Sequence, residues 1–512
     1  MTTRTKKATA GYITSLAQYA VAVAMQFAIA PVVLKIAGQD TLGAFAVISQ
    51  ALAYLALIDM GLGPAFGRSQ AQAYGKDDNL CEFSKVVSTG RTIALIVNSL
   101  YAILVFVLTF YIGKIFSLDG QLLVEAKYGL WIIALWAILR TPWSAYNGVL
   151  VSSQNMAISN IVIGISNVIK LGGSLLFVWY GWGLTGLMVS NVAGEAFAQV
   201  ITRIYAKKRC PHLKLTWGIP DKQLLKNVMG FASQIIVVNI SVAIITKSDH
   251  LIVGSMISVA SSSVLYTTMT TTNILGIVVR QIVDTATPGI NELYARGNID
   301  QLRSVYLRLH RYTMILAIPL FAGCAVLTQP FVSMWVGNKQ YAGHVVAVGL
   351  AINAFAVSIS HVSHMFINAD GKIRILSIFT IAEGLCKIIL SITLVHYYGL
   401  PGIVLSTLIA GLFTTNIYLM CRGNDIVKVQ WREFAHQVVV PLIVPTLLSI
   451  ATLFLLIYYV GAASPMKFIL SGGAFVFVYI ISAILTGAIN KQEVDKICET
   501  TKLNTLIKKY TL

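Results

Sequence analysis

Residues 167–186 read NVIKLGGSLLFVWYGWGLTG, and residues 384–402 read GLCKIILSITLVHYYGLPG. At a constant offset of 217 residues, the identical pairs include Lys170 with Lys387, Ser174 with Ser391, and Tyr180 with Tyr397. Each stretch is an apolar block that carries one lysine and then turns through glycines into the next apolar block. A block of about 20 apolar residues spans the hydrocarbon core of a membrane as a helix. The two stretches therefore predict a pair of membrane helices that occurs twice in the chain.

The composition of the whole chain also indicates a membrane protein. Hydrophobic residues make up 56% of the 512 residues, charged residues make up 11%, and the mean hydropathy is +0.75. A soluble globular chain has about 25% charged residues, so this chain has too few to cover a surface that faces water. Because water is absent from the hydrocarbon core, each apolar block must satisfy its own backbone as a helix. We predict an all-α, polytopic membrane protein.

Fourteen apolar blocks follow one another along the sequence. The first six cover residues 12–37, 41–62, 90–113, 128–151, 158–180 and 183–206. The next six cover residues 227–248, 251–283, 310–337, 343–366, 374–398 and 400–421, and a last pair covers 437–460 and 466–489. The predicted parts are an N-lobe (1–210), a C-lobe (211–425), and a C-terminal helix pair with its tail (426–512). Because six spans is an even number, the two lobes would insert with the same orientation, around an axis along the membrane normal.

A second echo supports the repeat. Residues 59–78 and 284–300 each begin with an aspartate, continue to a proline four or five residues later, and end on acidic residues after an aromatic and a glycine. Two parallel six-helix lobes around a central cavity are typical of transporters. We therefore predict a transporter rather than a structural protein.

The net charge of +18 is best explained by membrane orientation. If the N-terminus is cytoplasmic, 28 of the 38 Lys and Arg residues fall in inner segments and six fall in outer loops. This bias predicts that both termini lie in the cytoplasm. The basic inner loops, 203–226 and 296–311, are predicted to contact anionic membrane lipids. A nucleic-acid partner is not predicted, because the charge serves orientation.

Several charged residues fall inside the predicted spans, where a charge costs about 2.5–3.5 kcal/mol on insertion scales. The basic ones are Arg140, Lys170, Arg280 and Lys387. The acidic ones are Glu195 and Glu383 at depth, with Asp59 and Asp284 near the cytoplasmic ends of their spans. Arg140 stands two residues before Pro142, where we predict a kink. Four basic residues against two deep acidic ones predict a cavity that attracts anions, with phosphate the best match to Arg and Lys.

Each of these charges also has a purely structural explanation. Glu383 and Lys387 are four residues apart on one helix and can satisfy each other. Arg280 can extend its side chain to the inner interface. Lys170 can pair with Glu195 across helices, whereas Arg140 has no acidic residue nearby in sequence. These alternatives stay open at the level of the sequence.

The sequence offers no sign of enzymatic chemistry. It contains no P-loop, no metal-ligand cluster and no nucleophile–base set, so we predict neither an enzyme nor a cofactor. His361 and His364 lie on one face of a span, where protonation or packing is the predicted role. No motif identifies a coupling ion, so Na⁺ and H⁺ both stay open. A membrane polysaccharide polymerase or ligase would need a sizeable outer loop with catalytic groups, and the longest predicted one, 114–127, is short.

The segment 30–75 carries a family resemblance. Its recognisable pieces are Leu42-Gly43 before the second span, Asp59-x-Gly61-Leu62-Gly63 at the end of that span, and, further along, the short turns YGWGLTG and YGLPG. These residues and the helix pattern resemble polysaccharide flippases of O-antigen type in the multidrug/oligosaccharidyl-lipid/polysaccharide (MOP) exporter superfamily.

The resemblance implies a function that the residues alone do not name. It implies transfer of undecaprenyl-pyrophosphate-linked oligosaccharide across the bacterial inner membrane by alternating access, for surface polysaccharides such as lipopolysaccharide. The cavity cations would bind the pyrophosphate, and the acidic residues would act as gates or partners. Polysaccharide polymerase and ligase proteins are expected partners. The rival within the superfamily is an ion-coupled multidrug or metabolite exporter, which would have a cavity dominated by acidic and aromatic residues.

Overall fold

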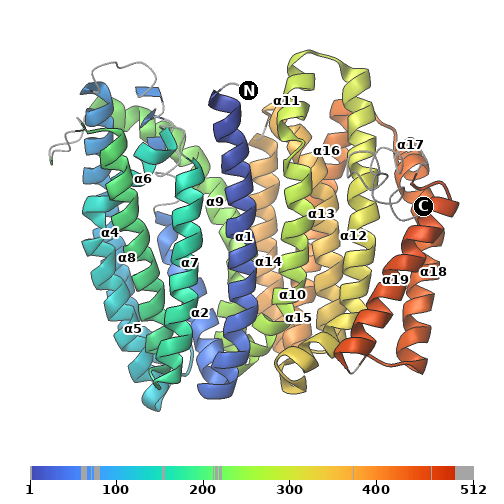
Figure 1. The fold of residues 1–512 in the computed structure, drawn as a ribbon, viewed down its shortest axis with the longest axis horizontal. Helices are drawn as coiled ribbons and strands as arrows, with labels where there is room; N and C mark the ends of the chain where they lie inside the picture. The colour runs from blue at the N-terminus through green and yellow to red at the C-terminus, as the bar shows by residue number, and fades with distance from the viewer. Residues whose placement is uncertain are drawn as a thin grey trace, which may run out of the picture. The chain divides into compact units, whose positions relative to one another are not determined.

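The computed structural model describes residues 3–58, 81–152, 156–211, 222–372, 374–462 and 464–489, with a few single positions at 66–73, 213 and 217. Within these residues the regular structure is helical and contains no strand (Figure 1). Twelve of the described helices are long and apolar enough to cross a membrane. The predicted all-α, polytopic fold is confirmed.

The helices before residue 260 begin with α1 (Thr3–Ile36), which has Pro31 inside it. They continue as α2 (Gln39–Leu55), η1 (Ala56–Ile58), α4 (Cys81–Ile115), α5 (Gly120–Leu139), α6 (Thr141–Ser152), α7 (Met156–Trp179), α8 (Gly183–Arg209) and α9 (Lys222–Met256). Those that follow, as far as residue 370, are α10 (Val259–Asp284), α11 (Thr287–Ala295), α12 (Ile299–Trp335), η2 (Asn338–Gln340) and α13 (His344–Asp370).

The remaining helices begin with α14 (Arg374–Tyr398) and α15 (Leu400–Gly411). They continue as the π-helical turn η3 (Leu412–Asn416), α16 (Ile417–Val427), α17 (Trp431–Phe434), a second π-helical turn η4 (Ala435–Val439), α18 (Val440–Tyr459) and α19 (Pro465–Leu485). Where the structure describes them, the fourteen predicted apolar blocks thus correspond to helical structure.

The chain groups into two compact units. Unit 1 contains residues 1–266 and 388–403, and unit 2 contains residues 267–387 and 404–512. In unit 1, α7 packs against both α1 and α8, and α5 packs against α4 and α8 (Figure 1). The predicted lobe boundaries near residues 210 and 425 stay predictions.

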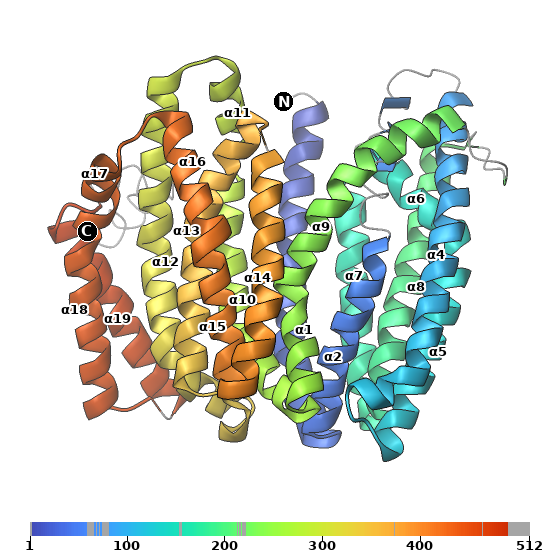
Figure 2. The ribbon, with the colours of Figure 1, turned by 180° about the vertical axis from the view of Figure 1, so that it is seen from behind.

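Unit 2 is built around α12, which packs against α13, α19 and the η4–α18 segment (Figure 2). Its core contains a buried polar contact in which the hydroxyls of Tyr306 and Ser363 lie 2.8 Å apart. The Nε2 atom of the fully buried His310 lies 3.3 Å from the Ser363 hydroxyl, so each member of this group has a hydrogen-bonding neighbour. Satisfied polar groups of this kind stabilise a membrane bundle without leaving bare donors in hydrocarbon.

The internal repeat is visible in how two helix pairs cross. In unit 1, a Cβ added to Gly194 of α8 would lie 2.4 Å from Lys170 Cγ and 2.8 Å from the Ser166 carbonyl oxygen of α7. In unit 2, a Cβ added to Gly411 of α15 would lie 3.4 Å from Glu383 Oε1 of α14. Gly411 and Glu383 each follow Gly194 and Ser166 by 217 residues, which is the offset of the sequence repeat. Both copies therefore bring the second helix against the first at a glycine.

Two details of the predicted spans can be compared with the structure. The predicted kink before Pro142 is confirmed, because the helix is interrupted at Arg140 between α5 and α6. The predicted break at residues 249–250 is wrong, because α9 continues to Met256. Asp249 and His250, between the predicted spans 227–248 and 251–283, are both buried, and His250 Nδ1 lies 3.0 Å from the Ser262 hydroxyl of α10.

Candidate functional site

One cavity of unit 1 lies among α2, η1, α4, α5 and α8, and it has a volume of about 350 Å³. Its walls combine small and apolar residues with three aromatic rings, two charged groups and two further polar side chains. The lining residues are Phe45, Ser49, Leu52, Ala53, Ala56, Tyr101, Ile133, Trp136, Ala137, Arg140, Met188, Asn191, Val192 and Glu195. One arginine and one glutamate therefore share an otherwise largely apolar space within the membrane-spanning part of the unit.

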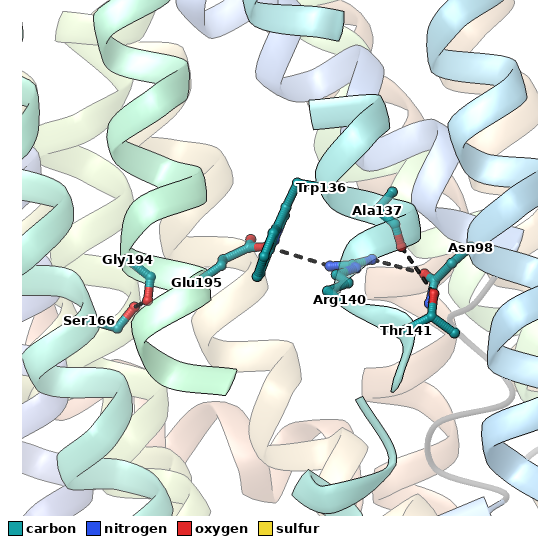
Figure 3. A network of polar contacts seen from close by, with 8 residues as sticks. All are labelled: Asn98, Trp136, Ala137, Arg140, Thr141, Ser166, Gly194 and Glu195. Atoms are coloured by element: carbon teal, nitrogen blue, oxygen red, sulfur yellow. Dashed lines mark hydrogen bonds and ion pairs between the residues drawn. The ribbon is translucent and has the colours of Figure 1, made fainter. Parts of the chain in front are cut away.

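Arg140 enters this cavity from the break between α5 and α6. Its Nη2 atom donates a hydrogen bond to Asn98 Oδ1 of α4 at 3.2 Å, and its Nη1 lies 3.5 Å from Glu195 Oε2 of α8 (Figure 3). Asn98 is itself fixed, because its Nδ2 atom contacts the Thr141 hydroxyl at 3.2 Å. The guanidinium side chain is 28% exposed, so it is held in place yet open to the cavity.

Glu195 is held between two donors. The indole Nε1 of Trp136 donates to Glu195 Oε2 at 3.1 Å, and Arg140 Nη1 lies 3.5 Å from the same oxygen (Figure 3). The contact with Arg140 is long for a charge-assisted hydrogen bond, which usually measures about 2.7–2.9 Å. The Glu195 side chain is 42% exposed. A carboxylate with a second donor can release Arg140 without losing every hydrogen bond.

Lys170 does not share this cavity. Its stem packs on Gly194 of α8, and it forms no ion pair within the part of the chain that the structure describes. The neighbouring Ser166 hydroxyl donates to the Gly194 carbonyl oxygen at 2.7 Å, on the side of α8 away from Trp136 (Figure 3). The structural alternative in which Lys170 pairs with Glu195 therefore does not describe this conformation, because Glu195 contacts Arg140 instead.

The other two predicted cavity cations belong to unit 2. The guanidinium of Arg280 folds back along α10, where its Nη1 would lie 3.0 Å from a Cβ on Gly276. Lys387 is 1% exposed and interacts electrostatically with Glu383, which is 8% exposed. The structure does not gather either cation into the Arg140 cavity, and the role of all four as substrate ligands stays a prediction.

The predicted gating acids divide between described and undescribed parts. Asp284 stands at the end of α10. Its Oδ1 atom lies 2.7 Å from Nε2 of His361 on α13. His361 in turn lies beside His364, with ring centroids 5.8 Å apart. Asp59 lies outside the described residues. Asp284 therefore has a titratable basic neighbour, as a gate residue requires.

The sequence did not indicate the residues that position Arg140 and Glu195. Asn98 is a single amide in a long apolar block, and Trp136 stands one helical turn before Arg140. Both signals are present in the sequence, but neither says which charge the side chain meets. That information comes from the packing of α4, α5 and α8.

The comparison with protein families gives a decisive match. The family model described as "Polysaccharide biosynthesis protein" matches residues 39–346, which is more than half of the chain. The chain belongs to this family. The sequence-based resemblance to polysaccharide transporters of the MOP superfamily is confirmed. Among curated protein sequences, none matches this family member.

Solved structures show that the family member has a MOP-superfamily fold. "Lipid II flippase MurJ, inward closed conformation" superposes with a TM-score of 0.72 at 15% identity, covering 94% of this chain and 99% of that one. An inward-facing multidrug resistance MATE family transporter gives a TM-score of 0.66 at 12% identity, with 81% and 99% covered. A MOP superfamily transporter from Pyrococcus furiosus, described as having a binding pocket of reverse polarity, gives 0.56 at 14% identity, with 83% and 96% covered.

Proposed function

We propose that this protein is a flippase that moves lipid-linked oligosaccharide, carried on undecaprenyl pyrophosphate, across the bacterial inner membrane. Membership of the polysaccharide biosynthesis family supports a role in building a surface polysaccharide such as O-antigen. The fold shared with a lipid II flippase supports a substrate that joins a sugar headgroup to a lipid through phosphate. Both termini would lie in the cytoplasm, as the distribution of Lys and Arg predicts.

The observation that carries the proposal is the state of Arg140. A charged guanidinium at membrane depth persists where it faces a partner or a cavity, and Arg140 faces both. Its fixed contacts, Asn98 and Glu195, leave the side chain 28% exposed to a space of about 350 Å³. Arginine binds phosphate oxygens in a bidentate manner, which suits a pyrophosphate better than a neutral sugar.

The arrangement suggests how a substrate would exchange with Glu195. A pyrophosphate that approaches Arg140 competes with a single carboxylate oxygen held at 3.5 Å. Glu195 can keep the hydrogen bond from Trp136 while it gives up Arg140. Arg140 would thus change from the partner of Glu195 to the ligand of an anion, while Glu195 keeps one hydrogen-bond donor. The prenyl tail would stay in the surrounding lipid, because an apolar chain gains no free energy by leaving it.

The remaining charges would act in alternating access. Lys170, Arg280 and Lys387 would contact the headgroup in conformations other than this one. Asp284 would exchange its partner His361 for another cation as the inner side opens, and Asp59 would do the same in the N-lobe. Na⁺ and H⁺ are the two coupling ions that the proposal allows. Polysaccharide polymerase or ligase proteins would act on the exported product.

An ion-coupled multidrug or metabolite exporter is the second candidate function. The cavity favours it in one respect, since Glu195 and the rings of Phe45, Tyr101 and Trp136 would suit an organic cation. This candidate predicts efflux of cationic dyes that depends on Glu195. The flippase predicts polysaccharide export that depends on Arg140.

The test uses a strain that needs this gene for its surface polysaccharide. Arg140→Ala is expected to abolish the polysaccharide at normal protein level, and Arg140→Lys to restore part of it, since lysine keeps the charge but not the bidentate geometry. Arg296→Ala is the matched control, because Arg296 is 70% exposed and, among the described residues, its ion pair is with Glu292, four positions earlier. Normal polysaccharide in the Arg140→Ala strain, or dye efflux without any polysaccharide phenotype, would contradict the proposal.

A further inference from the structure

Two further arginines lie at the predicted cytoplasmic end of unit 1. Arg91 stands near the start of α4 and Arg203 near the end of α8, and both side chains are partly buried. The guanidinium carbon of Arg91 lies 3.7 Å from the ring centroid of Trp217, and that of Arg203 lies 5.9 Å from the ring centroid of Trp143. Neither arginine lines the Arg140 cavity.

The two arginines lack the partners that such charges normally have. Within the described residues, neither guanidinium forms an ion pair or a hydrogen bond. The Nε–H of Arg91 is buried with no acceptor. Its electrostatic neighbours are Tyr146 and, with repulsion between like charges, Arg203. Buried donors are nearly always satisfied, so an orphaned guanidinium donor beside a second cation requires an explanation.

The surrounding protein does not supply that explanation. The tryptophan rings stabilise the planes of the guanidinium groups, but their faces offer no strong acceptor to the N–H groups. The core beside them is apolar and includes Phe83, Val87 and Val149. Two guanidinium groups that repel each other, one of which has an Nε–H without an acceptor, match the oxygens of a phosphate, which accepts bidentate hydrogen bonds and cancels the mutual repulsion.

We infer that Arg91 and Arg203 form an anion-binding site for the phosphate group of a lipid headgroup, distinct from the Arg140 cavity. The two places are linked through aromatic rings, because Trp143 under Arg203 lies 6.3 Å from Trp136, which lines that cavity. A headgroup bound at Arg91 and Arg203 would therefore be separated from the Arg140 cavity by the rings of Trp143 and Trp136. This use of the site as a first docking point rests on the proposed function, whereas the phosphate chemistry does not.

The test measures lipid binding to the purified full-length protein in nanodiscs. The probes are a polyprenyl diphosphate, phosphatidylglycerol and inorganic pyrophosphate, so that a substrate-like lipid, a bulk lipid and the free anion are compared. The double variant Arg91→Gln/Arg203→Gln is expected to bind at least one of the two lipid probes at least about tenfold more weakly. This factor corresponds to the loss of one net charge-assisted hydrogen bond. The charge-matched control is Lys35→Ala/Lys114→Ala, which removes two exposed cations from the predicted outer side of the same unit.

The outcomes separate this inference from the function. A loss confined to polyprenyl diphosphate assigns the site to the substrate, and a loss confined to or shared by phosphatidylglycerol assigns it to membrane phospholipid; both support a phosphate-headgroup site. No loss with either lipid, or an equal loss in the lysine control, overturns it. An unchanged Tm of the Gln double variant excludes misfolding as the cause of a loss, and Arg91→Lys/Arg203→Lys, with the charge kept, should retain part of the binding. The polysaccharide test on Arg140 is unaffected by any of these results.

Discussion

Replacing Gly194 with alanine should separate two helices that the structure brings into close contact. The new Cβ would lie 2.4 Å from Lys170 Cγ and 2.8 Å from the Ser166 carbonyl oxygen. The lysine stem can swing aside, but a backbone oxygen moves only with its helix. Because real Cβ contacts are not this short, α7 and α8 must move apart, and the hydrogen bond from the Ser166 hydroxyl to the Gly194 carbonyl, now 2.7 Å, must lengthen.

The cost follows from two opposing effects. Overpacking of this kind costs about 1–3 kcal/mol, and the weakened hydrogen bond adds about 1 kcal/mol. Alanine returns up to about 1 kcal/mol, because it favours a helix over glycine. We therefore expect Gly194→Ala to lower the free energy of unfolding by about 1–3 kcal/mol.

Thermal unfolding of the detergent-solubilised protein, followed by loss of the monodisperse peak, measures this effect. Gly172→Ala on the partner helix α7 is the matched control, since nothing lies within 4 Å of the Cβ it would gain. That variant should keep or raise the Tm, because only helix propensity changes. Equal Tm values for the two variants would refute the close crossing of α7 and α8 at Gly194.

Three further changes have defined outcomes. Glu195→Gln should alter the free energy of unfolding by less than about 1 kcal/mol, since the ion pair of Glu195 is half-exposed. The same change should tighten binding of a polyprenyl diphosphate in nanodiscs, since the Glu195 carboxylate no longer competes for Arg140. Asp370→Asn should destabilise unit 2 by about 1.5–3 kcal/mol in thermal unfolding, because the buried carboxylate accepts from Arg422 at 2.9 Å and from the Tyr294 hydroxyl at 2.5 Å. Burial raises the pKa of the Cys210 thiol, so its alkylation by maleimide, followed by peptide mass spectrometry, should be slower at neutral pH in the folded protein than in the denatured one.

Each of these has its own control. Weaker diphosphate binding in the Glu195→Gln protein would show that the carboxylate assists the anion rather than competing with it. For Asp370, the comparison is Glu292→Gln, whose pair with Arg296 is mostly exposed and should contribute less than about 0.5 kcal/mol. Equal losses in both would mean that the Asp370 contacts are ordinary surface pairs. Equal alkylation rates in folded and denatured protein would contradict the burial of Cys210.

The helices could be predicted from the sequence because their signal is local. The length and apolar composition of a block predict that it spans the membrane, and Pro142 predicts the break at Arg140. Neither prediction needs information from another segment. The electrostatic interaction of Glu383 with Lys387 was also predictable, because the two residues are four positions apart on one helix. Such features depend on neighbours along the chain.

Features that depend on packing were out of reach. Arg140 and Glu195 are 55 residues apart, and only the packing of α5 against α8 brings them together. The end of α9 at Met256 was predicted too early, because Asp249 and His250 interrupt the apolar run, although both side chains are buried in the folded protein. A count of deep cations likewise could not show that the stem of Lys170 would pack on Gly194 and that Lys170 would not line the Arg140 cavity.

The most direct test of the central claim is translocation by the purified protein in proteoliposomes. A fluorescent oligosaccharide on polyprenyl pyrophosphate is placed in both leaflets, and its accessibility to a membrane-impermeant quencher is followed over time. The account predicts translocation that requires the protein, is lost in Arg140→Ala, is partly kept in Arg140→Lys and is unchanged in Arg296→Ala. Translocation by Arg140→Ala at the wild-type rate, or none by the wild-type protein while a cationic dye is exported, would contradict it.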